Sequence, residues 1–192
     1  MAMIALMIFG FSGHAIAEGM GYQLFCYLMD VSDRSLSVFT DDEQEYTFEL
    51  DSQLRVQSHS GRLNLDDVAL LSYSGGLNED TVDQPGVVVR MVTVLSTLNG
   101  TIENKDGDIL SIREMSDEGA VGNLYLFDME ASDMWTGEAG ANVHDEVEVA
   151  YEGTKDQLVP DQLQNLSYAH ITVYTQMEAG LDDIVSDDEA LE

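Results

Sequence analysis

The sequence predicts an all-β fold built from two small barrels in tandem, and three observations support this prediction. The chain has 192 residues, and its apolar content of 44% is sufficient for the packed cores of one or two small domains. From residue 22 onward, apolar side chains recur with a period of two in short runs separated by polar turns. Runs with similar residues in the same order then recur in the second half of the chain.

The first unit contains five expected strands. They lie at residues 22–31, 36–40, 46–50, 68–73 and 87–95. The polar turn at residues 32–35 joins the first two runs most simply as a hairpin. The last run is almost unbroken apolar sequence, which is typical of a strand that is buried on both faces.

The second unit repeats four segments of the first. The matched segments are 36–38 with 110–112, 46–50 with 125–129, 92–94 with 171–173, and 67–75 with 145–153. Their separations are 74, 79, 79 and 78 residues. The fourth match brings Tyr73 and Gly75 into line with Tyr151 and Gly153. We interpret the repeat as an internal duplication.

A unit of this size favours a closed sheet, because closure removes exposed strand edges and buries one alternating face. A long connection between the third and fourth of five strands is typical of the oligonucleotide/oligosaccharide-binding (OB) barrel. We therefore predict two five-stranded OB-like barrels, at residues 22–96 and 97–176. A single β-sandwich formed jointly by both halves is the alternative.

The segment 145–153 reads DEVEVAYEG and resembles a GD-x-V-x-V-x-Y-x-G pattern. This pattern is found in small repeated β-barrel modules of exported proteins of Gram-positive bacteria, mostly of unknown function. The chain has His144 where the pattern has Gly, and its first copy has Asp66 at that place and Ala69 at the first apolar position. The resemblance spans residues 22–176 and implies an exported protein of repeated barrels, without catalytic residues.

The N-terminal segment predicts export. Residues 3–11 read MIALMIFGF and are followed by Ala15-Ile16-Ala17, which is the order of a secretory signal peptide cleaved after Ala17. The apolar run is too short to span a membrane, although no Lys or Arg precedes it as a signal peptide normally requires. A buried N-terminal helix or strand is the alternative. We expect residues 1–17 to be a signal peptide, and the mature protein to be extracellular or in the cell envelope without a membrane span.

The charge balance is strongly acidic. Seven Lys and Arg residues face 37 Asp and Glu residues, for a net charge of -30. Such a chain should repel phosphate backbones and other copies of itself, so we expect no nucleic-acid partner and a monomer. Residues 177–192 combine dense acid with a few aliphatic side chains and predict an acidic disordered tail.

No catalytic, metal-binding or cofactor-binding motif is evident. Cys26 is the single cysteine, and the histidines lie in unrelated contexts, at His14, His59, His144 and His170. Acidic pairs could act as general acid and base, but the composition alone makes such pairs common, at 41–42, 66–67, 182–183 and 187–188. Residues 104–108 resemble part of a calcium loop but lack the carboxylates of an EF-hand, and they predict a hairpin turn with Gly107 at positive φ. The sequence therefore predicts no enzyme and no cofactor.

Trp135 and its neighbour Met134 are the candidate binding residues. They lie in the long connection between the third and fourth strands of the second unit. A Trp in such a loop either anchors a ligand or closes the mouth of its own barrel. We expect a secreted or cell-envelope protein that binds or spaces other components, with a polysaccharide or another envelope protein as the partner. The alternatives are a small carboxylate-based hydrolase and a low-affinity divalent-cation-binding protein.

Overall fold

The computed structural model describes residues 21–58, 60–115, 121–136 and 140–174. Within them the chain is all-β, which confirms the predicted fold class. The predicted signal peptide, residues 1–17, and the predicted tail, residues 177–192, lie outside the described residues. The chain divides into two compact units, one of Met1–Thr97 with Ala150–Lys155 and one of Leu98–Val149 with Asp156–Glu192.

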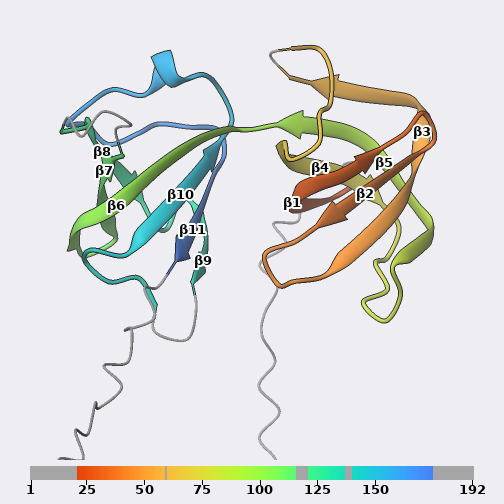
Figure 1. Cartoon of the computed structure of the whole chain (residues 1–192), viewed down its shortest axis with the longest axis horizontal. Coiled ribbons are helices and arrows are strands. Elements are labelled where there is room, and N and C mark those ends of the chain that lie inside the picture. The colour runs from red at the N-terminus through yellow and green to blue at the C-terminus, as the bar shows by residue number, and fades with distance from the viewer. Residues whose placement is uncertain (1–20, 59, 116–120, 137–139, 175–192) are drawn as a thin grey trace, which may run out of the picture. The chain divides into compact units, whose positions relative to one another are not determined.

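The first unit is a closed barrel of five strands (Figure 1). They are β1 (Tyr22–Val31), β2 (Ser35–Phe39), β3 (Glu45–Gln57), β4 (Val68–Ser74) and β5 (Asp83–Val94). The strand order around the barrel is β1-β2-β3-β5-β4. β3 and β5 pair in parallel. The pairs β1 with β2, β2 with β3, β1 with β4 and β4 with β5 are antiparallel. Closure therefore gives every strand of this unit a neighbour on both sides.

Alternation along the strands fills the barrel interior. Cys26 and Leu28 on β1 are no more than 1% exposed and belong to the core cluster. Phe25 and Tyr27, which alternate with them, lie on the outer side of the sheet. Aromatic rings occupy the same core: the ring of Phe48 lies 6.1 Å from that of Tyr46 and stacks 6.2 Å from that of Tyr73. The barrel interior is thus packed with side chains.

The second unit is a six-stranded sheet. Its strands are β6 (Ser96–Asp106), β7 (Ile109–Glu114), β8 (Leu124–Asp128), β9 (Asp133–Thr136), β10 (Glu146–Tyr151) and β11 (Ala169–Tyr174). Their order is β8-β7-β6-β10-β11-β9. This matches the order of the first unit when β6, β7, β10 and β11 stand for β1, β2, β4 and β5, and when β8 and β9 together stand for β3. Tyr73 on β4 and Tyr151 on β10 accordingly lie on corresponding strands.

The second unit has six strands where we predicted five, because a turn at residues 129–132 interrupts the strand that corresponds to β3. The Asp128 carboxylate accepts a hydrogen bond from the Glu130 N–H at 2.9 Å and so favours the turn that ends β8. β9 then pairs in parallel with β11, as the far half of β3 pairs with β5.

The predicted hairpin at residues 104–108 is confirmed. β6 and β7 pair antiparallel up to Asp106 opposite Ile109, and Gly107 has a φ of 58°. A residue with a Cβ is rarely found at this φ, which explains the glycine at the turn.

Apart from the strands, the described residues form one 3₁₀ turn, Lys155–Gln157. In this part of the chain, no helix combines the length and the apolar character needed to cross a membrane.

Candidate functional site

The predicted binding residues lie on a short strand. Met134 and Trp135 belong to β9, where Met134 pairs with Ile171 and Trp135 pairs with Thr172 of β11. The sequence placed both residues in a loop, whereas the structure places their backbone at one end of the strand order of the second unit. Their role as binding residues remains a prediction.

Asp67 and Asp145, which immediately precede β4 and β10, form hydrogen bonds that stabilise turns. The Asp67 carboxylate accepts a hydrogen bond from the Asn64 N–H at 2.7 Å, and the Asp145 carboxylate accepts one from the Asn142 N–H at 2.8 Å. Each aspartate thus closes the turn before its strand, in the same way in both copies. The pairs at 182–183 and 187–188 lie outside the described residues.

The residue before each of these aspartates has left-handed backbone geometry. Asp66 has a φ of 65° and His144 has a φ of 79°. The sequence pattern that this chain resembles has Gly at this position, and Gly adopts positive φ without a steric penalty. Asp66 and His144 are therefore turn residues in corresponding places.

Cys26 is a buried free cysteine in the core of the first barrel. Its Sγ lies 3.7 Å from the carbonyl oxygen of Ala69, to which the thiol donates. Burial, with a further contribution from the Asp41 carboxylate, raises the pKa of the Cys26 thiol far above its usual range. The thiolate is the reactive form of cysteine, and the raised pKa disfavours it. We therefore assign Cys26 to the packed core.

The histidines are dispersed. His144 lies in the turn before β10, His170 is buried on β11, and His14 and His59 lie outside the described residues. Among the residues that the structure describes, no group of three or more His, Cys, Asp or Glu side chains is placed to hold a metal ion.

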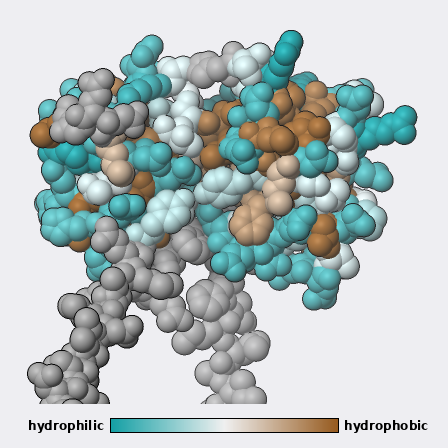
Figure 2. Space-filling model, viewed as in Figure 1, coloured by the Kyte–Doolittle hydropathy of each residue, from teal (hydrophilic) through white to brown (hydrophobic). Residues whose placement is uncertain are grey.

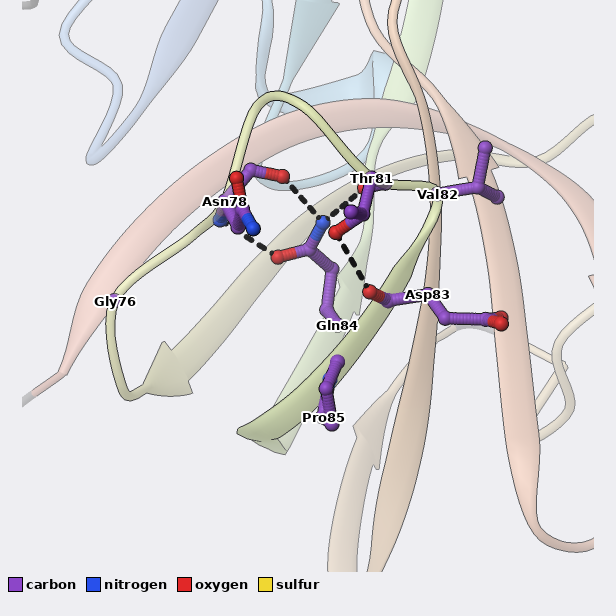
Figure 3. Close-up of a pocket in the computed structure, with 7 residues that line it drawn as sticks. All are labelled: Gly76, Asn78, Thr81, Val82, Asp83, Gln84 and Pro85. Atoms are coloured by element: carbon purple, nitrogen blue, oxygen red, sulfur yellow. Dashed lines mark hydrogen bonds between the residues drawn. The ribbon is translucent and has the colours of Figure 1, made fainter.

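A pocket of about 590 Å³ lies beside the loop that leads into β5 (Figure 3). It is lined by Gly76, Asn78, Thr81, Val82, Asp83, Gln84 and Pro85. The Gln84 side chain is only 3% exposed, and its carboxamide points into the loop, where all its hydrogen-bonding groups are used. Its Oε1 accepts from the Asn78 N–H at 2.8 Å, and its Nε2 donates to the carbonyl oxygens of Asn78, at 2.7 Å, and Thr81.

The second unit contains an equivalent set of hydrogen bonds around Gln164. The Gln164 Oε1 accepts from the Val159 N–H at 2.9 Å, and its Nε2 donates to the carbonyl oxygens of Val159, at 2.8 Å, and Gln162. Two copies of one glutamine clamp at corresponding loops indicate that Gln84 holds the chain rather than a ligand. The pocket is therefore a consequence of the loop, and its most polar buried group is already engaged.

The outer surface of the first barrel offers a different kind of site. Phe25 and Tyr27 alternate with the buried Cys26 and Leu28 on β1, and their rings meet edge to face with centroids 5.6 Å apart. Tyr27 pairs with Phe39 of β2, whose side chain is 39% exposed. We call the surface formed by Phe25, Tyr27 and Phe39 the aromatic face.

Aliphatic side chains extend this surface. Val68 and Leu70 of β4 stand directly opposite Tyr27 and Phe25, so they lie on the same outer side of the sheet, but each is only 7% exposed and is therefore buried. Met29, at the register shift of β1, is 49% exposed. Figure 2 shows apolar side chains gathered on the viewer's side of this unit, among hydrophilic ones.

Carboxylates surround the aromatic face. Glu45 of β3 is exposed and pairs with Phe39, and Asp30 of β1 is exposed next to Met29. Asp41, Asp42 and Glu43 follow in the turn directly after β2. No Lys or Arg occurs in β1, β2 or β4. The surface therefore combines one exposed ring, Phe39, and two half-buried rings, Phe25 and Tyr27, with a rim of negative charge.

The sequence interpretation overlooked the aromatic face, although a signal was present. In residues 22–31 both alternating sets of positions are apolar or aromatic, whereas a strand with a solvated outer face would have polar residues at one set. Apolar side chains on the outer set indicate a face that is not fully solvated.

No protein-family model and no curated protein matches the chain. Solved structures that resemble it include one described as Drosophila Unr CSD456, with 11% sequence identity and a TM-score of 0.28. The match covers 81% of this chain and 63% of that chain, so this protein spans less than two thirds of its length.

The prediction that excluded nucleic acid as a partner is wrong. The similar structure consists of cold-shock domains, which are nucleic-acid-binding. The exclusion relied on the net charge of -30, which is a sum over the whole chain. Binding of single strands depends on the side chains of one face, and aromatic stacking contributes to it beside charge. A likeness at this TM-score locates no nucleic-acid site on the chain.

Proposed function

We propose that this protein is an exported, non-catalytic module that binds another protein of the cell envelope. The observation that carries this proposal is the aromatic face. On this face Phe39 and Met29 are 39% and 49% exposed, and they adjoin the half-buried rings of Phe25 and Tyr27. Partly exposed apolar side chains that adjoin one another on a strand surface are typical of surfaces that associate with a partner.

The character of the face favours a protein over a polysaccharide. Val68, Leu70 and Met29 adjoin the rings, and the outward polar groups on β2 are the hydroxyls of Ser35 and Ser37. The Ser37 hydroxyl already shares a hydrogen bond of 2.9 Å with the Thr47 hydroxyl. Sugar rings carry many hydroxyls that need hydrogen-bonding partners, whereas an apolar protein segment does not.

The non-catalytic part of the proposal is supported by the uses of the groups that could have been reactive. The Cys26 thiol is held protonated in the core, and the carboxylates of Asp67 and Asp145 cap turns. Export is supported by the signal-peptide pattern of residues 1–17.

The test presents the purified full chain, in parallel, to a panel of purified envelope proteins, to a glycan array and to peptide, ester and glycoside substrates. We expect saturable binding to at least one envelope protein and no turnover. Turnover that disappears when a single carboxylate is replaced would contradict the proposal, and so would binding to glycans without binding to any protein.

A further inference from the structure

We propose that the aromatic face of the first barrel binds a cationic segment of its partner, in which Lys or Arg residues alternate with apolar side chains. This inference rests on the proposed function and names the chemistry of the partner. It is argued from the placement of three rings, their apolar neighbours and the surrounding charges.

The apolar part of the surface requires an apolar contribution from the ligand. The Phe39 side chain is 39% exposed and Met29 is 49% exposed, although both lie beside rings and aliphatic groups on the same outer side of the sheet. Covering such groups removes apolar area from water, at about 25 cal/mol per Å². A purely charged ligand would leave this area wet.

The charges specify the sign of the ligand. Glu45 stands opposite Phe39, and Asp41, Asp42 and Glu43 occupy the turn that follows it. No Lys or Arg lies in β1, β2 or β4, the strands that carry the rings and their aliphatic neighbours. An anionic ligand would be repelled, and a cationic one is attracted by complementarity.

Aromatic rings bounded by carboxylates also suit the individual cations. A Lys ammonium or Arg guanidinium can lie over the face of Tyr27 or Phe39 while it pairs with Glu45, which stands opposite Phe39. A nucleic acid could also stack on the rings, but its phosphates would meet the same carboxylates. The rim therefore favours the cationic peptide over the nucleic acid.

The test uses the full chain and a fluorescent peptide of alternating Lys and Phe, at about 0.15 M salt, where the screening length is about 8 Å. Comparison peptides alternate Lys with Gly, which keeps the charge, and Glu with Phe, which keeps the rings. An oligo-deoxythymidine is the nucleic-acid probe. We expect the Lys-Phe peptide to bind at least about tenfold more tightly than any of the three.

Variants then locate the site. Phe39→Thr should weaken binding of the Lys-Phe peptide by about tenfold or more, because it removes an exposed ring. The matched control is Val56→Thr, at a β3 side chain that is 38% exposed and lies outside the face, and it should leave binding unchanged. Glu45→Gln removes a rim charge without a change in size and should weaken binding severalfold, mainly through the association rate.

Equal binding of the Lys-Phe and Lys-Gly peptides would show attraction by net charge alone and would overturn the inference. Undiminished binding in Phe39→Thr, or tighter binding of the oligo-deoxythymidine, would overturn it as well. If an envelope protein binds but the Lys-Phe peptide does not, the inference fails while the proposed function stands. If the peptide binds as expected but the protein also turns over a substrate, the proposed function fails instead.

Discussion

Replacing Gln84 and Gln164, one at a time, should show how much burial adds to the stability that a glutamine contributes through the same number of hydrogen bonds. Gln84 and Gln164 each accept one backbone hydrogen bond and donate to two carbonyl oxygens. Their surroundings differ, because Gln84 is 3% exposed whereas Gln164 is half-buried. The variants Gln84→Ala and Gln164→Ala therefore delete the same bonds in two environments.

The expected cost follows from the groups left behind. Gln84→Ala leaves one N–H and two carbonyl oxygens of its loop without their partner, where each unsatisfied buried group costs about 1–3 kcal/mol. Water reaches the loop through the adjacent pocket and offsets part of this cost. We expect a loss of about 2–3 kcal/mol for Gln84→Ala and about 1 kcal/mol for Gln164→Ala, where water can replace the bonds.

Urea unfolding monitored by circular dichroism measures the total loss, and hydrogen exchange assigns it to a loop. The Asn78 amide donates to Gln84, and the Val159 amide donates to Gln164, so their exchange rates report the two sites separately. A loss of 2–3 kcal/mol corresponds to exchange that is roughly 30- to 160-fold faster at Asn78. Gln53→Ala, which removes an exposed side chain, is the control and should cost less than about 0.5 kcal/mol.

Equal losses in Gln84→Ala and Gln164→Ala would refute the assignment of the difference to burial. Losses below about 0.5 kcal/mol in both would refute the larger claim that the glutamine clamps hold their loops.

Four further predictions concern charge, backbone, titration and processing. Raising the salt concentration from low values to about 0.5 M should raise the melting temperature, because it screens repulsion among the charges behind the net -30; a flat or falling melting temperature would contradict this. Asp66→Gly and His144→Gly should each stabilise the fold by about 0.5–1 kcal/mol in urea unfolding because both positions have positive φ, whereas Gly107→Ala, at a φ of 58°, should destabilise it; stabilisation by all three variants would argue against backbone strain. Burial, with Tyr22 and Tyr46 nearby, raises the pKa of Tyr73 from 10.0 to about 12, so the stability present below pH 10 should fall as the pH rises through 12, and Tyr73→Phe should flatten that fall; an unchanged slope in the variant would exclude Tyr73 as its source. Mass spectrometry of the exported protein should show cleavage after Ala17, and recovery of the intact N-terminal segment from the medium would contradict the signal peptide.

The strands were predictable where the side-chain alternation is strong. The sequence predicts a strand at residues 22–31, and β1 is Tyr22–Val31. The third strand was predicted only at 46–50, but β3 continues to Gln57 past three polar residues, 51–53, that interrupt the alternation. Its far half is held by parallel pairing with β5, a long-range contact that has no local signature in the sequence.

The second unit shows the same limit. Its strand order follows from the duplication, which was visible in the spacing of matched segments such as those containing Tyr73 and Tyr151. The division of one strand into β8 and β9 was not visible, because it depends on whether an interrupted segment finds a partner in β11. The same pairing places Trp135 on a strand where a loop was expected.

The sequence by itself predicted the all-β class and the internal duplication. Periodicity and repeat spacing can be read directly from the order of the residues, so neither prediction needed the tertiary structure. Only the tertiary structure decided which apolar residues lie inside and which lie outside. Phe25 and Cys26 are neighbours in a strand of apolar residues, and closure of the barrel buries one and presents the other on the aromatic face. The physical reason is that alternation fixes two opposite faces but not their environments, which depend on the strands that curl around one of them.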